Sequence, residues 1–404
     1  MSSLNIKKLL VVQAFVSNAL VIYPLYAIMF TERSGLRVSE VSVLFAIWTI
    51  AALLFELPTG LIADKYPRKY ILICGELVNA GAFLVWLFMP TFLGYAVGFI
   101  LWGAAYALKS GAYQALIYDE LAASNQTKDY TKMMSRIKAA EFSGMLLAFI
   151  TAYAMSMRGV DYTLLLCASI ATGLLSAILL LFVPNTRQRD AAQPTESQLK
   201  LLKRTFRVIV RTPNIQNTVA WLAIVGGFIG WYEEYTPLFD SAAGIPTKFI
   251  PLVISGALVL NILASLIAYR FESEKLLSKT LLILSAGVVA LCATLGWWLP
   301  VAILFVHSGL ILLRVLRILL DAELQHAAES SVRATLGSVA GFLSYPITVA
   351  VALGFAGLSK NMHGFLPFRW VSIALLVCGA VLLVVTMRSS KMNRSIITTK
   401  IKKT

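Results

Sequence analysis

Lys109 stands in the middle of a long apolar stretch, where a charged side chain needs a functional or structural reason. Tyr106 and Tyr113 lie about one helical turn before and after it, on the same face of a helix. A charge within a membrane-spanning helix costs on the order of 3 kcal/mol by insertion scales. An ammonium that faces a cavity binds carboxylate or phosphate groups, and tyrosines add ring faces and hydroxyl groups. We therefore predict that these three residues contact a solute; a structural ion pair between Lys109 and an acid on another helix is the alternative.

Four acidic residues in or beside apolar stretches are candidates for carrying a proton, namely Glu56, Glu76, Asp119 and Glu141. A carboxyl group that burial removes from water holds its proton more readily and can take part in proton transfer. Glu56 could equally pair with arginines of the adjoining loop. Glu76 and Glu141 could instead pair with the basic residues that flank their stretches, so the sequence leaves both roles open.

A second group of candidates lies in the C-terminal half of the chain. Trp231, Glu234 and Tyr235 share one helical face near the end of an apolar stretch, and such an acidic and aromatic patch would bind or release a polar solute. Aromatic belts at membrane interfaces explain the aromatic part equally well. Arg314 lies deep enough in its stretch to bind an anionic solute, whereas Arg317 is expected to extend to the membrane interface.

The elements that must hold these residues are long apolar helices. The chain has 404 residues, of which 58% are hydrophobic and 14% are charged, and its mean hydropathy of +0.78 lies outside the range of soluble proteins. Because about 20 apolar residues cross a membrane as a helix, the hydropathy pattern predicts spans at residues 9–30, 40–63, 70–89, 92–118, 138–157, 162–183, 214–238, 249–269, 280–299, 301–320, 334–357 and 366–387. We therefore predict an all-α membrane protein with about twelve transmembrane helices.

Polar side chains cluster in the first predicted span. Gln13 and Asn18 lie in its first half, and Tyr23 and Tyr26 follow toward the other end. Such groups are expected to line a central cavity, although hydrogen bonds to neighbouring helices would explain them equally. The apolar run is too long for the core of a signal peptide, so we expect this helix to be retained.

The distribution of basic residues predicts the orientation of the spans. Most of the 35 Lys and Arg residues fall on one side, and those expected on the outer side are Arg33, Arg37, Arg158, Lys248, Lys360 and Arg369. Because positively charged loops stay in the cytoplasm, both termini are predicted to be cytoplasmic. The net charge of +15 follows from this topology, so the lipid bilayer is an expected partner and nucleic acid is not.

A long polar stretch divides the predicted spans into two sets of six. We predict an N-terminal six-helix bundle over residues 1–184, a cytoplasmic linker over 185–213, a C-terminal six-helix bundle over 214–390, and a basic cytoplasmic tail over 391–404. Within the linker, residues 197–210 could form a basic amphipathic helix that lies on an anionic membrane surface. A solvated connector that only sets the topology is the alternative.

The motifs of common enzyme and cofactor sites are absent from the sequence. It has no GxxxxGK[ST] phosphate loop, no GxGxxG after a strand, no HExxH and no GxSxG. The three histidines are scattered, and each cysteine stands alone in its own apolar stretch, at Cys74, Cys167, Cys292 and Cys378. We therefore expect no enzymatic activity, no cofactor and no metal site, and any uphill transport must draw on an ion gradient.

One charged loop carries a resemblance to a known family. The string GLIADKYPRK, at residues 60–69, resembles the major facilitator signature G-x-L-A-D-x-x-G-R-[RK] of the loop between the second and third helices. The resemblance implies that Gly60, Asp64, Arg68 and Lys69 form a latch that holds the two halves in the outward-facing state. Pro67 departs from the usual glycine. An ordinary positively charged loop is the alternative.

Shorter strings resemble a branch of bacterial major facilitator transporters that contains many efflux proteins. They are ELPTG at residues 56–60, YDEL at 118–121 and RAT at 333–335. The signature of drug–proton antiporters in the fifth span is missing, since Gly144 and Ala148 give only a pair of small residues. More weakly, the whole chain is similar to exporters of peptide antibiotics such as microcins.

The resemblance implies a fold, a mechanism and a location. We expect a major facilitator fold of two six-helix bundles in a bacterial inner membrane, acting as a monomer. Transport would use alternating access and the proton gradient to export a drug, toxin or peptide antibiotic. A proton-coupled importer of a sugar or organic anion is the first alternative, because the same fold supports it. A sensor without transport, or a membrane-embedded enzyme, is the second.

Overall fold

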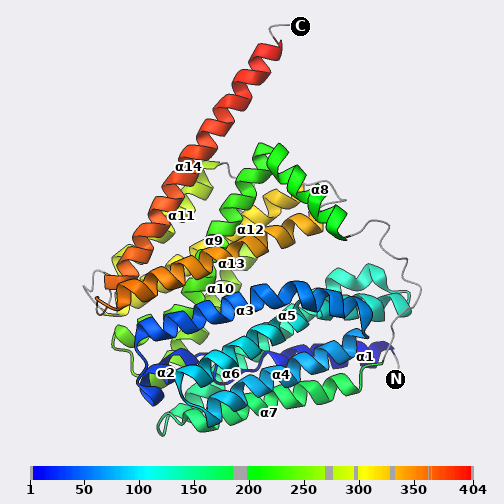
Figure 1. Ribbon diagram of the computed structural model, residues 1–404, viewed down its shortest axis with the longest axis vertical. Coiled ribbons are helices and arrows are strands. Elements are labelled where there is room, and N and C mark those ends of the chain that lie inside the picture. Colours follow the sequence, from blue (N-terminus) through cyan, green and yellow to red (C-terminus); the bar gives the residue numbers. More distant parts are fainter. Residues whose placement is uncertain are drawn as a thin grey trace. The chain divides into compact units, whose positions relative to one another are not determined.

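The computed structural model describes residues 3–184, 198–268, 276–294, 299–327, 333–362, 364 and 366–401, and these are almost entirely helical (Figure 1). The α-helices are α1 (Ser3–Ser17), α2 (Tyr26–Ser34), α3 (Val38–Lys65), α4 (Arg68–Phe88), α5 (Phe92–Ala123), α6 (Tyr130–Ser156), α7 (Tyr162–Leu181), α8 (Gln198–Arg211), α9 (Pro213–Ala242), α10 (Ile250–Ile267), α11 (Leu276–Ala293), α12 (Leu299–Ala327), α13 (Arg333–Ser359) and α14 (Leu366–Ile401). Short 3-10 helices, η1 (Thr127–Asp129) and η2 (Thr247–Phe249), precede α6 and α10. The all-α prediction is confirmed.

Nine helices of the described chain are long and apolar enough to cross a membrane. They correspond to nine of the twelve predicted spans. The first, seventh and ninth predicted spans have no counterpart among these nine helices. The ninth matches the shorter apolar segment Leu282–Ala293 within α11. The seventh is α9, a helix of 30 residues whose C-terminal half carries Glu233, Glu234 and Asp240 and is therefore less apolar.

The first predicted span is not one continuous helix, so this part of the prediction is wrong. Residues 18–25 lie between α1 and α2 outside any helix, and they include Pro24. Proline lacks a backbone N–H and disfavours helix at the residue before it. Side chains supplement the backbone hydrogen bonds at this break. Asn18 Nδ2 donates to Ala14 O at 2.9 Å, beside the Asn18 N–H at 3.3 Å, and the Ile22 N–H donates to Ser169 Oγ at 2.9 Å. The break is therefore stabilised by the surrounding structure.

Contacts between Cα atoms divide the chain into two compact units. Unit 1 contains residues 1–193 and 244–258, and unit 2 contains residues 194–243 and 259–404. The short segment 244–258 thus packs with the N-terminal half although it follows α9 in the sequence. The predicted boundaries at 184 and 214 remain predictions.

In unit 1, α4 packs between α5 and α7, and α5 also packs against α3 (Figure 1). The α1 helix packs against α6 and α7, and it meets α6 at close range because Gly144 has no side chain. A Cβ atom on Gly144 would lie 2.1 Å from the backbone oxygen of Phe15. The small pair Gly144 and Ala148 seen in the sequence therefore serves helix packing, and both residues are buried.

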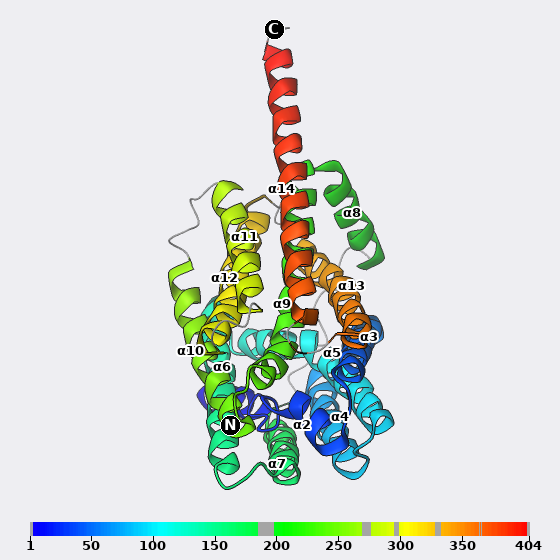
Figure 2. The same cartoon turned by 90° about the vertical axis from the view of Figure 1, so that its left-hand side faces the viewer.

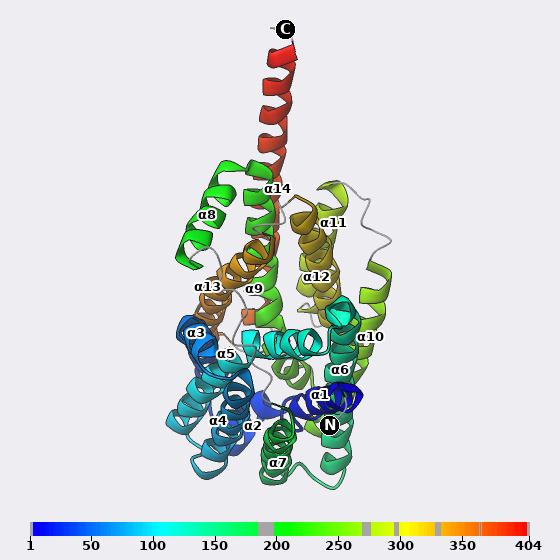
Figure 3. The ribbon, with the colours of Figure 1, turned by 90° about the vertical axis from the view of Figure 1, so that its right-hand side faces the viewer.

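In unit 2, α9 packs against α12 and α13, and α11 packs against α12 and α14; Figure 3 shows α11 and α12 side by side. The α14 helix continues past the other helices of its own unit (Figure 2). The predicted amphipathic helix of the linker exists as α8, with Thr205 and Ile209 buried and its described basic side chains exposed. Its position on a membrane surface remains a prediction.

Candidate solute-binding cavity

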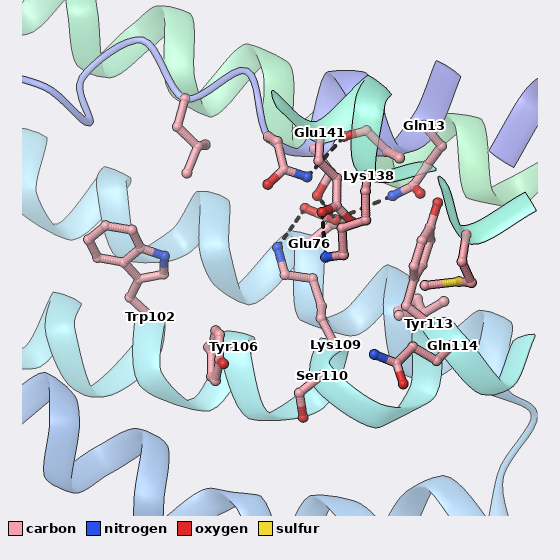
Figure 4. A pocket seen from close by; sticks show the side chains of 16 residues that line it. Gln13, Glu76, Trp102, Tyr106, Lys109, Ser110, Tyr113, Gln114, Lys138 and Glu141 are labelled. Carbon is pink, nitrogen blue, oxygen red and sulfur yellow. Dashed lines mark hydrogen bonds and ion pairs between the residues drawn. The ribbon is translucent and has the colours of Figure 1, made fainter. Parts of the chain in front are cut away.

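A cavity of about 390 Å³ lies within unit 1, at the level where the first helix breaks (Figure 4). Its volume falls in the range of pockets that enclose small ligands. The polar and aromatic residues of its wall come from α1, the break, α4, α5 and α6, and are Gln13, Ser17, Asn18, Glu76, Trp102, Tyr106, Lys109, Ser110, Tyr113, Gln114, Lys138 and Glu141. Seven of the residues predicted from the sequence, which are Gln13, Asn18, Glu76, Tyr106, Lys109, Tyr113 and Glu141, are thus brought together.

Glu76 of α4 is the buried centre of this wall, with 1% of its surface exposed. Its carboxylate accepts from Ser17 Oγ at 2.5 Å and from Gln13 Nε2 at 3.4 Å, both on α1, and pairs with Lys109 Nζ of α5 at 3.4 Å. Gln13 Nε2 also donates to Ser176 Oγ of α7 at 3.0 Å. Donors from α1 and α5 therefore reach the carboxylate of α4, and Gln13 links them to α7, which explains how so buried a charge is held. The alternative role predicted for Lys109, an ion pair with an acid of another helix, is present together with its place in the cavity.

A second acid–base pair lies on α6, where Lys138 Nζ approaches Glu141 Oε2 at 2.7 Å. Figure 4 shows this pair on the same wall as Glu76 and Lys109. Lys138 is more than half exposed, so its contact with Glu141 is weaker than a buried pair. The cavity thus presents two positive and two negative side chains and has no net charge from them.

Aromatic rings form another part of the wall. Trp102 and Tyr106 of α5 lie beside Trp48 of α3, with ring centroids 6.2 and 5.8 Å from that indole. The hydroxyl of Tyr113 donates to Leu10 O at 2.9 Å, so this group joins α5 to α1 and only the ring remains for a solute. Tyr106 is 42% exposed and is the more accessible of the two predicted tyrosines.

The two basic residues of the loop signature, Arg68 and Lys69, form an ion pair and hydrogen bonds with other residues of unit 1. Arg68 pairs with Asp119 of α5 and also donates to Ala115 O at 3.0 Å, while Lys69 Nζ donates to the carbonyl oxygens of Leu181 and Val183, each at 2.6 Å. These contacts join the start of α4 to the ends of α5 and α7. The backbones of Gly60 and Asp64 lie in α3, but the surroundings of Gly60 and the side chain of Asp64 lie outside what the structure describes. The latch and the proton-carrying role of Asp119 remain predictions.

Glu56 lies in α3 and is half-buried, and it remains a candidate for proton transfer. Its Oε2 atom is buried and has no hydrogen-bond partner among the described residues. A buried carboxyl oxygen without a hydrogen-bond donor is costly as an anion, which makes Glu56 suited to binding a proton. The predicted pairing of Glu56 with loop arginines is not seen in the described part of the chain, in which Arg68 binds Asp119.

In unit 2, the predicted Arg314 pairs with Glu233 of α9, the neighbour of the predicted Glu234. Arg314 Nη2 and Nε lie 2.6 and 3.1 Å from Glu233 Oε1. Trp231 and Tyr235 are 1% exposed, and their rings stack at 4.4 Å inside a cluster with Phe355 and Phe368. Both aromatic residues therefore pack the interior of unit 2. Their contact with a solute stays a prediction, as does that of the partly exposed Glu234.

The pair of Asp240 on α9 and His307 on α12 escaped the sequence analysis. His307 Nε2 lies 3.1 and 3.3 Å from the two carboxylate oxygens of Asp240, and Asp240 is fully buried. Asp240 lies just beyond the predicted seventh span. His307 stands alone in the sequence, without other metal-binding residues nearby, so neither residue is predicted to be part of a site. An acidic residue at the margin of an apolar stretch was the available signal.

Replacing Arg314 by glutamine is expected to lower the free energy of unfolding by about 2 kcal/mol, because Glu233 then keeps a charge without its hydrogen-bonded cation. Arg317→Gln is the matched control on the same helix. Arg317 is 44% exposed, and its ion-pair partner in the described part of the chain is Asp321, one turn away at 3.9 Å, so a loss under about 1 kcal/mol is expected. Denaturant unfolding of the two purified variants measures the difference, and equal losses would show that the Arg314 pair adds nothing.

Comparison with known proteins identifies the family. A family model described as "Major Facilitator Superfamily" matches residues 9–354. No curated protein sequence matches significantly. Among solved structures, the nucleoside transporter NupG aligns at 14% identity with a TM-score of 0.73, over 96% of this chain and 99% of that one.

Two further structures share the fold at similar identity. A bacterial homolog of the human lysosomal transporter Spinster aligns at 14% identity with a TM-score of 0.69, over 95% of this chain and 96% of that chain. A D-xylose–proton symporter aligns at 14% identity with the same TM-score, over 94% and 96% of the two chains. The fold prediction is confirmed, and the chain belongs to the major facilitator superfamily of secondary active, multi-pass membrane transporters, which are not enzymes.

Proposed function

We propose that the protein is a proton-coupled exporter of a small polar, peptide-like solute, acting as a monomer in a bacterial inner membrane. The cavity of unit 1 is its solute-binding site, and one observation carries this assignment: two acid–base pairs and exposed aromatic rings line a single cavity of ligand size. Peptide-like compounds carry an amine and an acidic group together, and both signs of charge find a partner on this wall. The rings of Trp102 and Tyr106 offer surface for an aromatic or heterocyclic part.

The Glu76–Lys109 pair supplies a route to proton antiport. An acidic group of the solute binds Lys109, and an amine of the same solute binds Glu76 in its ionised form. A proton that arrives at Glu76 neutralises the carboxylate and removes the partner of the amine. Proton and solute therefore compete for one site, which is the condition for exchange of one against the other across the membrane.

Import is the second candidate function. Whether the solute carries an amine decides between export and import. A solute with an acidic group and no amine would take Lys109 away from Glu76, so that Glu76 would gain a proton while the solute is bound. Solute and proton would then travel together, as in a symporter. Two proteins of the same fold are named as a nucleoside transporter and a D-xylose–proton symporter, which keeps a nutrient solute such as a sugar or organic anion in view.

Everted membrane vesicles with an imposed pH gradient test this proposal. Proton release is followed by a quenched fluorescent dye as aromatic dipeptides, peptide–nucleotide compounds and antibiotics are added one at a time. We expect dequenching by compounds that carry both an amine and an acidic group, and its loss in Glu76→Gln and in Asp64→Asn vesicles with normal amounts of protein. Silence toward all of them, with uptake of acidic compounds or sugars by whole cells, would establish the importer instead.

A further inference from the structure

The Asp240–His307 pair is a buried acid–base pair whose chemistry differs from that of the solute cavity. His307 Nε2 lies within 3.3 Å of both carboxylate oxygens of Asp240, and the two residues have 7% and 0% of their surfaces exposed. Both belong to unit 2, on the packed helices α9 and α12. A carboxylate so far from water requires a compensating group, and here that group is an imidazole.

Three other acids of the described chain pair with lysine or arginine, in the pairs Glu76–Lys109, Arg68–Asp119 and Glu233–Arg314. Arginine keeps its proton under all cellular conditions, and lysine holds its proton well above neutral pH. Such a pair is neutral only while its acid stays ionised. Histidine is the side chain whose ordinary pKa lies nearest to neutral pH, so a histidine–aspartate pair is suited to exchanging a proton that a lysine or arginine pair retains.

We propose that Asp240 and His307 form a proton-binding site of the transporter, whose ligand is a proton taken from the outer side of the membrane. In the loaded state the pair holds an imidazolium beside a carboxylate and is neutral. Release of the proton leaves a neutral imidazole that donates to the carboxylate. The proton comes from a hydronium ion, so an N–H bond of the imidazole forms as an O–H bond breaks, and release to water reverses both changes.

The location of the pair agrees with access from outside. Asp240 lies two residues before the end of α9, and His307 lies eight residues after the start of α12. Both are the outer ends if the termini are cytoplasmic, as the distribution of basic residues predicts. A proton from outside therefore reaches this pair before it reaches the inner half of the helices.

The charged groups named next, which lie on described parts of the packed helices, bind partners other than Asp240 and His307. The helices packed against α9 are α8, α12, α13 and α14. On α12, Arg314 lies about 10 Å along the helix from His307 and is bound to Glu233. On α14, Arg369 donates to the carbonyl oxygen of Thr294 at 3.0 Å. The described side chains of α13 carry no charge, and the basic α8 precedes the opposite end of α9.

Infrared difference spectra of the purified, solute-free protein, recorded while the pH is stepped between 5 and 8, test this site directly. The wild-type protein is expected to show imidazole bands and a carboxylate band that change together with one titration. His307→Gln should lose the imidazole change, and Asp240→Asn should lose the carboxylate band and shift the imidazole titration by about one pH unit or more, a tenfold change in proton affinity. Asp129→Asn, an exposed acid in unit 1, is the matched control and should leave the titration as in the wild type.

Two outcomes would overturn the proton site. Persistence of the imidazole change in His307→Gln would place the titrating histidine elsewhere, and an unshifted titration in Asp240→Asn would show that the two residues do not share a proton. If Asp240→Asn fails to fold, Asp240→Glu retains a carboxylate, and its band is expected at a changed frequency with the titration kept. Because the infrared titration needs no solute, its result does not depend on the outcome of the vesicle transport assay.

The role of this pair in coupling rests on the proposed function and needs the vesicle measurement. Asp240→Asn vesicles are expected to lose proton release while the purified variant still binds the dipeptide phenylalanyl-alanine. Wild-type coupling in these vesicles would contradict the role in coupling. Silence of the wild-type vesicles would instead count against the proposed function, and the infrared titration would still decide whether the proton site exists.

Discussion

Lys109→Gln is expected to lower the free energy of unfolding by about 3 to 5 kcal/mol, which is the usual cost of leaving one charge of a buried pair without its partner. The reason lies in Glu76, which is 1% exposed and would lose its cation, so that it must either stay charged with Ser17 and Gln13 as its described donors or take up a proton. Glu76→Gln should cost less, because Lys109 is 25% exposed and extends toward the water of the cavity. Denaturant unfolding of the purified protein in detergent measures both.

The double variant Lys109→Gln/Glu76→Gln measures how strongly the effects of the two single substitutions depend on each other. Both charges are gone, and the new amide at position 76 still accepts from Ser17 and Gln13, so its stability should return to within about 1 kcal/mol of the wild type. Transport should stay lost, because the double variant lacks both Lys109 and Glu76, to which the acidic group and the amine of the solute are proposed to bind. A double variant that loses the sum of the two single losses would show that Lys109 and Glu76 are not coupled.

Gly144→Ala is expected to destabilise unit 1 by about 3 kcal/mol, the upper end of the range for overpacked cores. The added Cβ would lie 2.1 Å from the backbone oxygen of Phe15, and a backbone atom within α1 has no rotamer by which to move away. The helices α1 and α6 must then separate, and with them the walls of the solute cavity. We expect reduced amounts of folded protein and a lower midpoint of thermal unfolding.

Gly81→Ala is the matched control for this substitution. Gly81 lies inside α4, and a Cβ there would meet no atom within 4 Å, apart from its own helix and neighbours. Alanine should therefore stabilise this helix by up to about 1 kcal/mol, because glycine is the poorer helix former. Equal effects of Gly144→Ala and Gly81→Ala would refute the close approach of α1 and α6.

Hydropathy and charge predicted most of the fold, and the break in the first helix shows where they fail. Residues 9–30 read as one apolar run, because hydropathy averages over many residues and a single proline changes it little. Pro24 and Asn18 were the local signals. Whether such a signal bends, breaks or merely ends a helix depends on the partners that replace its hydrogen bonds. Here one partner is Ser169, which is 147 residues away from Ile22 in sequence.

The residues of the solute cavity were predictable one by one, but their pairing was not. Polar groups in apolar spans identified Lys109, Glu76 and Gln13, because each charge or amide in a membrane needs a partner. Which helix supplies that partner depends on how far each helix rotates and tilts in the bundle. The adjacent residues Glu233 and Glu234 point about 100° apart on a helix. Spacing alone therefore favoured Glu234, whereas the structure pairs Glu233 with Arg314.

The central claim is that the cavity of unit 1 binds a solute through both signs of charge, and calorimetric binding to the purified protein tests it most directly. The probes are phenylalanyl-alanine, its N-acetyl derivative without the ammonium, and its amide without the carboxylate. We predict that the unmodified dipeptide binds at least about tenfold more tightly than either derivative, a difference of about 1.4 kcal/mol, and that Lys109→Gln/Glu76→Gln abolishes this preference. Equal affinity for the three probes, no binding of the dipeptide, or an unchanged preference in the double variant would contradict the claim.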